Sequence, residues 1–186
     1  MFFVRQKGLS SATRTAILDA ANRVIIKKGA DSLTLDAVAH EAGISKGGLL
    51  YHFASKRSLI EAMLDRQIAA IDSLFEEELG KEGGDFVTAY IRASFVTDPN
   101  RTRISQAMIA AVAHDPELIK PLQARFAKMQ KALSSAAVTP EIGTIIRLAL
   151  DGLWISDLFG FAPPSAALRE KMQRAILRIA DFKRAP

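Results

Sequence analysis

Residues 43–53 read GISKGGLLYHF, a stretch in which two adjacent glycines follow a Ser-Lys pair. A glycine inside a helix costs up to about 1 kcal/mol relative to alanine, so a short helix that holds both Gly47 and Gly48 needs a reason for them. Gly43 suits a sharp turn, and Ser45 is a typical N-cap because its hydroxyl accepts a backbone N–H. The stretch predicts a turn followed by a short helix over about residues 45–53.

The residues on either side of this stretch predict more helices. Residues 11–28 place apolar side chains on one helical face, and Thr34 caps a short helix that ends at Gly43. Two short helices joined by the turn at residues 42–45 form a helix-turn-helix, whose second helix reads DNA in its best-known use. Ser55 caps a longer helix that runs to about residue 79.

The positive charge of the chain lies in its first third. Residues 1–57 hold nine Lys and Arg against four Asp and Glu, a net charge of +5, whereas residues 58–186 hold sixteen of each sign. A basic segment joined to a neutral body is typical of a module that binds a polyanion. A basic excess of this size is also common on proteins that bind no nucleic acid, so charge alone leaves both readings open.

The remaining residues also follow a helical period. They predict helices at about residues 85–96, 101–114, 116–137, 140–161 and 164–183, so that the chain is an all-α protein of about nine helices. No apolar run approaches the length of a membrane span, and the N-terminus lacks a secretory signal pattern. The absence of cysteine fits a reducing cytoplasm, and three scattered histidines give no metal-ligand spacing. We therefore expect a cytoplasmic protein without metal, cofactor or membrane partner.

The run LTLDAVAHEAGISKGGLLYHFASKRSLIEAML closely resembles the DNA-binding domain of the tetracycline-repressor (TetR) family of transcriptional regulators. The resemblance rests on Thr34, the turn at residues 42–45, Gly48, the run at residues 50–53 and the Ser55-Lys56 pair. It implies a three-helix helix-turn-helix DNA-binding domain over residues 1–57 and a helical effector-binding and dimerisation domain over residues 58–186. The implied partners are a palindromic double-stranded DNA operator, a second copy of the chain and a small, hydrophobic effector.

The resemblance implies that eight residues lie at or near DNA: Thr34, Ser45, Lys46, Gly47, Gly48, Tyr51, His52 and Lys56. Thr34 and Ser45 have a second role as helix caps. Packing against other side chains is an equal alternative for His52 and a lesser one for Tyr51. Leu50 and Phe53 are three residues apart, which predicts one inner face. Leu49 would then lie on the outer side, where it contacts a thymine methyl group.

The helix predicted at residues 140–161 is apolar around most of its circumference, which indicates burial on more than one side. The resemblance implies dimerisation through the last two helices, and the candidate interface residues are Ile145, Leu148, Gly152, Ile155, Phe159, Met172, Ile176 and Ile179. Candidate effector contacts are Phe95, Met108, His114, Phe126 and Trp154, although an apolar stripe at helical spacing is also typical of an ordinary core.

Three functions remain to be compared. The first is a ligand-responsive repressor that leaves its operator when an effector binds. The alternatives are an activator, or a helix-turn-helix module of the same fold that binds a protein and has no effector. An enzyme is disfavoured because no cysteine, metal-ligand set or glycine-rich phosphate loop is present.

Overall fold

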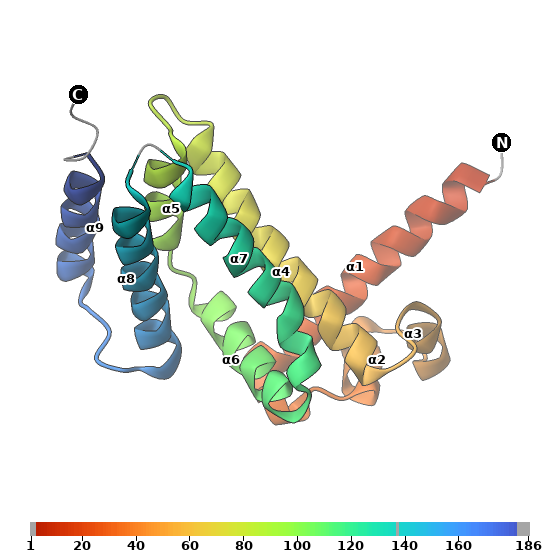
Figure 1. The fold of residues 1–186 in the computed structure, drawn as a ribbon. Helices are drawn as coiled ribbons and strands as arrows, with labels where there is room; N and C mark the ends of the chain where they lie inside the picture. Colours follow the sequence, from red (N-terminus) through yellow and green to blue (C-terminus); the bar gives the residue numbers. More distant parts are fainter. Residues whose placement is uncertain (1–2, 137, 182–186) are drawn as a thin grey trace. The chain divides into compact units, whose positions relative to one another are not determined.

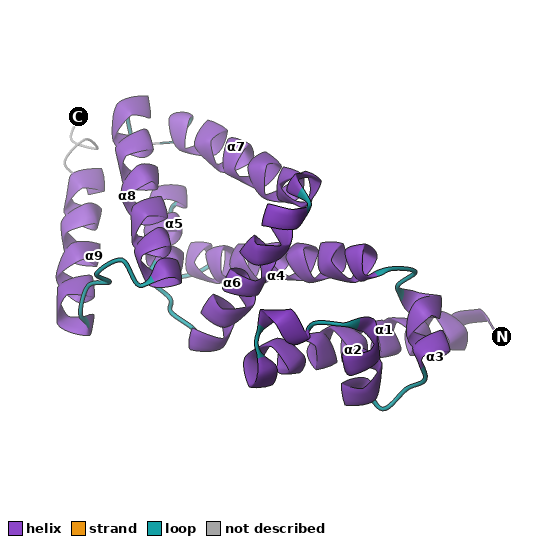
Figure 2. Ribbon diagram, turned by 90° about the horizontal axis from the view of Figure 1, so that it is seen from below, coloured by secondary structure: helices purple, strands orange, loops and turns teal. Residues whose placement is uncertain are grey.

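The computed structural model describes residues 3–136 and 138–181, with only the backbone described for residues 3–10 (Figure 1). The described residues form helices and no strand, which confirms the predicted all-α class (Figure 2). The α-helices are α1 (Phe3–Lys28), α2 (Leu35–Ala42), α3 (Lys46–His52), α4 (Lys56–Leu79), α5 (Phe86–Ser94), α6 (Pro99–His114), α7 (Lys120–Ser134), α8 (Pro140–Phe159) and α9 (Ala166–Asp181). Two 3-10 helices, η1 (Ala30–Ser32) and η2 (Pro116–Ile119), complete the set.

Two predicted helices differ most from those in the structure. The first helix begins at Phe3, well before the predicted residue 11, and its backbone continues without a break through Gly8. The helix predicted at residues 116–137 divides into η2 and α7, because Pro121 at the start of α7 lacks the N–H that a continuous helix needs. The last helix, α9, is described as far as Asp181, and its predicted end at residue 183 lies outside the described residues.

The described chain folds as two compact units, and each is built from separate segments. Unit 1 comprises residues 1–66 and 100–118, and unit 2 comprises residues 67–99 and 119–186. The units interleave along the sequence, because α6 returns to pack with the N-terminal helices. The predicted division into domains at residues 57 and 58 concerns function and stays a prediction.

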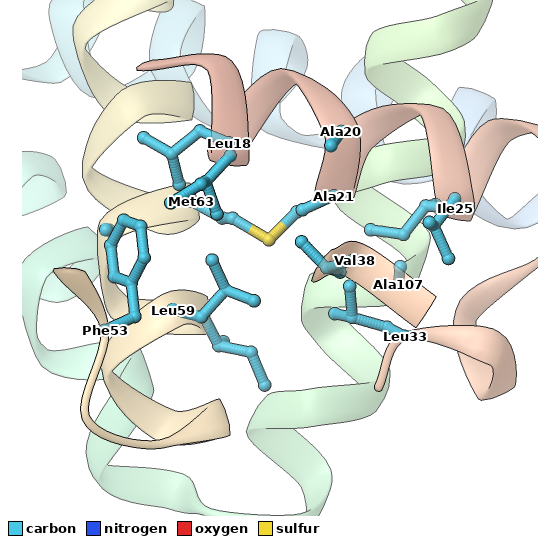
Figure 3. Packing of buried hydrophobic residues seen from close by; sticks show 14 of the residues in the cluster. Leu18, Ala20, Ala21, Ile25, Leu33, Val38, Phe53, Leu59, Met63 and Ala107 are labelled. Carbon is cyan, nitrogen blue, oxygen red and sulfur yellow. The ribbon is translucent and has the colours of Figure 1, made fainter. Parts of the chain in front are cut away.

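Unit 1 has a hydrophobic core to which α1, α2, α3, α4 and α6 all contribute. Figure 3 shows side chains from α1, α2, α4 and α6, with Leu33 and Phe53, directed into one shared interior that includes Met63 of α4. Ile17, Val38 and Leu59 are almost fully buried there. The core fixes α2 and α3 against α1, so that the helix-turn-helix is a rigid unit.

Capping residues account for the helix boundaries around the turn. The Thr34 hydroxyl accepts a hydrogen bond from the Ala37 N–H at 3.1 Å, and the Ser45 hydroxyl accepts one from the Gly48 N–H at 3.0 Å. Gly43 ends α2 in the left-handed conformation, with φ 68°, which residues with a Cβ rarely adopt. The Ser55 hydroxyl accepts from the Ser58 N–H at 3.1 Å and begins α4. These four predicted helix signals are confirmed.

Ion pairs join the helices of unit 1. Glu41 of α2 accepts hydrogen bonds from Arg23 at 2.8 Å and from Lys27 at 3.0 Å, both on α1. Hydrogen bonds from these two cations lower the pKa of the Glu41 carboxyl below its ordinary value. Arg57, at the start of α4, lies 2.6 Å from the Asp115 carboxylate just after α6. The pairs tie α2 to α1 and α6 to α4.

Unit 2 is a helical bundle in which α5, α8 and α9 lie against one another and α7 packs on α8 (Figure 1). Its core includes Val87, Ile91, Leu133 and Ile146. A Cβ atom at Gly143 would lie 3.1 Å from the Leu133 carbonyl oxygen, so a glycine lets α8 approach the α7 backbone closely at this position. None of the helices described between residues 3 and 181 is long and apolar enough to cross a membrane.

Candidate functional site

The outer surface of α3 is the candidate DNA interface. Tyr51 is 83% exposed, an unusual setting for an aromatic side chain in a folded protein, and Lys46 is also exposed. The possibility that Tyr51 is a packed core residue is therefore wrong. His52 is half-buried, and its ring meets the Tyr51 ring edge-on with 5.2 Å between ring centroids. Lys56 follows on the exposed first turn of α4.

The predicted positions of the two leucines on α3 are wrong. Leu49 is 0% exposed and lies in the core of unit 1, whereas Leu50 is 39% exposed. The helix begins at Lys46, so Leu49 and Phe53 lie four residues apart on the inner face and Leu50 turns outward. Leu49 therefore cannot contact a thymine methyl group, and Leu50 is the leucine available for such a contact.

Lys46 has a partner within the helix-turn-helix. Its Nζ atom lies 2.9 Å from Oδ2 of Asp36, in the first turn of α2, and both side chains are more than half exposed. An exposed pair of this kind contributes little to stability and is readily exchanged for another partner. The ion pair can therefore break so that Lys46 binds a phosphate. The sequence pattern did not predict that Asp36 competes for Lys46.

The two glycines of α3 have different surroundings. A Cβ atom at Gly47 would meet only Oγ of Ser45, at 4.0 Å, and Gly47 is exposed. A Cβ atom at Gly48 would lie 3.3 Å from the same hydroxyl and 4.0 Å from Cβ of Ile44. Packing within the protein therefore gives no reason for a glycine at position 47, whereas Gly48 leaves room for the capping hydroxyl.

A second surface of interest is an exposed apolar stripe on α8. Ile145 and Leu148 are each 56% exposed, and Ile155 and Phe159 continue the stripe at intervals of three and four residues. Gly152 lies between them, and a Cβ atom there would meet nothing within 4 Å. The spacing is that of the a and d positions of a coiled coil, which pack against a second helix.

The predicted interface residues on α9 divide between two faces. Ile179 is exposed and Met172 is half-buried, whereas Ile176 is 9% exposed and belongs to the core of unit 2. The inclusion of Ile176 in the interface is therefore wrong. Residues 168, 172, 175 and 179 follow one face of α9, and Ile176 lies at the side of that face, in the core of unit 2.

The predicted effector contacts divide between the two units. Met108 is buried in the core of unit 1, and its contact with an effector stays a prediction. His114, also in unit 1, is exposed and its Nδ1 atom lies 2.8 Å from the Ala110 carbonyl oxygen. Phe126 is half-buried and Trp154 is 38% exposed, both in unit 2. Phe95, also in unit 2, lines a cavity of about 320 Å³.

That cavity contains two arginines, Arg92 of α5 and Arg169 of α9. Arg169 forms an ion pair with Asp157 of α8. Arg169 was not among the predicted pocket residues. A charged residue in an amphipathic helix is usually solvated, and the position of Arg169 relative to the apolar residues does not indicate that it faces inward. Only the packing of α9 against α5 brings Arg169 to the cavity.

A polar network crosses the interior of unit 2. Arg147 donates a hydrogen bond to Gln130 at 2.5 Å and another to Asp151 at 2.5 Å. Burial raises the pKa of the Asp151 carboxyl despite the neighbouring Arg147. Burial, together with the Asp151 charge, raises the pKa of the Tyr90 hydroxyl to about 12. Tyr90 is therefore neutral at physiological pH.

Two family models match the chain. The one described as bacterial regulatory proteins, tetR family, matches residues 17–63, and the one described as tetracyclin repressor-like, C-terminal domain, matches residues 84–181. The first match covers α2 and α3, and the second covers most of unit 2. Together they span both surfaces described above.

Individual proteins agree with the family matches. The transcriptional regulator SrpR of Pseudomonas putida is 29% identical over 97 residues, which are 52% of this chain and 46% of SrpR, so the match spans about half the length of that relative. The structure of a TetR family member, SCO1917 from Streptomyces coelicolor A3, is 25% identical with a TM-score of 0.70, covering 90% and 97% of the two chains. The multidrug binding protein EbrR, solved with malachite green, has the same fold at 24% identity and a TM-score of 0.68, covering 89% and 96%.

Proposed function

The chain belongs to the tetR family of bacterial regulatory proteins, and from this premise we propose that it is a ligand-responsive, sequence-specific DNA-binding repressor that acts in the cytoplasm. The observation that carries the proposal is the outer surface of α3. On this surface the side chains of Tyr51 and Lys46 are exposed, and Gly47 has free space where a side chain would be. All three residues belong to the basic segment of the chain. No requirement of folding explains this combination, whereas contact with DNA does.

The first step of the proposed mechanism is docking of α3 in the major groove. Gly47 has no side chain, so the backbone of α3 can approach DNA closely at this position. The Tyr51 hydroxyl then donates to a phosphate oxygen, and Lys46 exchanges Asp36 for phosphate or a guanine edge. Leu50 is placed to meet a thymine methyl group. With so few long side chains on α3, recognition also depends on the shape of the DNA.

The second step is dimerisation through α8 and α9. The exposed stripe from Ile145 to Phe159 would be covered by the same stripe of a second copy, as a two-fold axis requires. Gly152 would let the two α8 helices approach closely at the centre of this contact. Two α3 helices separated by about one turn of DNA, roughly 34–36 Å, would then read a palindrome.

The third step is release of the operator by a small molecule bound to unit 2. In one conformation of the dimer the distance between the two α3 helices does not match the operator. A ligand that binds only this conformation increases its population and so lowers the affinity for DNA. EbrR, which shares the fold, is a multidrug binding protein, and this likeness supports a small-molecule site in the helical bundle. An activator would use the same steps with the opposite effect on transcription.

Fluorescence anisotropy with DNA from the region upstream of the protein's own gene tests the proposal. We expect binding at least about a thousandfold tighter than to random DNA at physiological salt. The double variant Tyr51→Ala, Lys46→Ala should lose this preference while circular dichroism shows an intact fold. Equal affinity for upstream and random DNA, in a protein that folds and dimerises, would count against a regulator of its own promoter. A genome-wide DNA selection with no enriched site would then refute the function.

A further inference from the structure

The cavity in unit 2 lies where the C-terminal ends of α4 and α5 approach the first turns of α9. Phe95 and Val96 form its apolar wall, and Arg92, Arg169 and Gln173 supply polar atoms. Its volume of about 320 Å³ is at the lower end of the range for ligand sites, roughly 300–1,000 Å³, so a small molecule would fit. All of these residues belong to one compact unit.

The two arginines of the cavity have unused hydrogen-bond donors. Arg169 is 17% exposed in its side chain and pairs with Asp157 through Nη2, whereas its Nη1 atom is buried and has no partner. Arg92 is half-buried, and its side chain forms no hydrogen bond or ion pair with any residue that the structure describes. A buried N–H donor without an acceptor is costly, so an acceptor that reaches Nη1 of Arg169 is favoured.

Each of the two carboxylates that line the cavity pairs with a cation outside it. Glu78 lies 2.5 Å from Nζ of Lys81, and Glu170 lies 3.8 Å from Nη1 of Arg174. Asp157 likewise offsets the charge of Arg169. Arg92 is left as the uncompensated charge, and the cavity therefore favours an anion over a neutral or cationic ligand.

We propose that this cavity binds a small organic acid, with the carboxylate between Arg92 and Arg169 and the apolar body against Phe95 and Val96. A guanidinium group matches a carboxylate in geometry, because two parallel N–H groups can donate to its two oxygens. The inference deepens the proposed function, on which it rests, by assigning the effector to the class of amphipathic carboxylates. It narrows the small, hydrophobic or amphipathic effector that the sequence predicted.

Isothermal titration of the full-length protein with benzoate, phenylacetate and octanoate tests the proposal, each acid being compared with its neutral amide. We expect at least one acid to bind and to raise the melting temperature, and its amide to bind at least about tenfold more weakly. Arg92→Gln should weaken binding of that acid at least tenfold. Because Arg92 has no partner to lose, this variant should fold normally.

Arg178→Gln is the matched control, since Arg178 lies on the same helix as Arg169, is exposed and does not line the cavity, and this variant should bind the acid as the unaltered protein does. Amides that bind as tightly as the acids, no binding by any of the three acids, or an affinity that Arg92→Gln leaves unchanged would each overturn the proposal. Operator binding is measured separately by anisotropy without any acid. A protein that binds its operator but no acid refutes this inference alone, whereas a protein that binds the acid through Arg92 but no operator refutes the regulatory function alone.

Discussion

Replacement of Gly47 by alanine should stabilise the protein while it weakens operator binding. Gly47 lies in the first turn of the seven-residue helix α3, its φ is not positive, and the added Cβ atom meets only the Ser45 hydroxyl at 4.0 Å. Alanine therefore fits without strain and restricts the unfolded chain, which raises the free energy of unfolding by about 0.4–1 kcal/mol. For a chain of this length, that gain raises the melting temperature by up to about 2–4 °C.

The effect on DNA binding should have the opposite sign. If the backbone at Gly47 approaches a phosphate, the new methyl group separates them, and the loss of a hydrogen bond to a charged group costs about 1.5–3 kcal/mol. That loss corresponds to an operator affinity at least about tenfold lower. Thermal denaturation followed by circular dichroism and operator titration by anisotropy measure the two effects on the same sample.

The control for Gly47→Ala is Gly80→Ala, after the end of α4. There a Cβ atom makes only ordinary contacts, at 3.5 Å and longer, and no DNA contact is proposed, so operator affinity should not change. A Gly47→Ala protein that is more stable but binds operator with unaltered affinity would refute the role of Gly47 in close approach. A fall in melting temperature would refute the assumption that alanine fits at this position.

Four further substitutions test the core of unit 1, a DNA contact, the dimer contact and an ion pair. Leu49→Ala should lower the free energy of unfolding by about 2–5 kcal/mol in urea denaturation, because Leu49 is fully buried, whereas Leu50→Ala at the exposed neighbouring position should lower it far less. Lys46→Gln should change stability by less than about 1 kcal/mol and reduce the salt dependence of DNA binding by about one phosphate contact; an unchanged salt slope would remove that contact. Gly152→Arg should give a folded monomer in sedimentation equilibrium, with Gln123→Arg on an exposed position of α7 as the control that stays dimeric. Glu41→Gln should reduce stability at neutral pH but not in strong acid. The lowered pKa of Glu41 gives a stabilisation that is present above the ordinary carboxyl pKa and is lost as the pH falls through the folded-state pKa. Melting curves of the two proteins, recorded in parallel over acidic pH, measure this difference.

Helix boundaries were predicted well because local chemistry decides them. Thr34, Ser45 and Ser55 satisfy free N–H groups within three residues of their own position, and Gly43 adopts the conformation that ends α2. Both signals can be read from a few adjacent residues without knowledge of the tertiary structure.

The rotation of α3 about its axis was not predictable in the same way. The helix has only seven residues, two of them glycine, so too few side chains remain to define an apolar face. A spacing of three from Leu50 to Phe53 and a spacing of four from Leu49 to Phe53 both fit a period of 3.6. The choice between them is made by the packing of α3 against α1 and α2 in the core of unit 1, and α1 lies far away in the sequence.

The apolar residues of α8 pose the same problem on a larger scale. Ile146, Leu150 and Leu153 face the interior of unit 2, whereas Ile145, Leu148 and Ile155 are exposed, and both sets are equally hydrophobic. Because the hydrophobic effect has no direction, composition alone cannot assign one set to the core and the other to a partner. The contact of Gly143 with the Leu133 backbone fixes the rotation of α8, and it leaves the second set without cover in a single chain. An exposed apolar stripe of this length on a single chain is unfavourable in water. The contact of Gly143 with Leu133 therefore helps to complete the core of unit 2 and also favours the dimer.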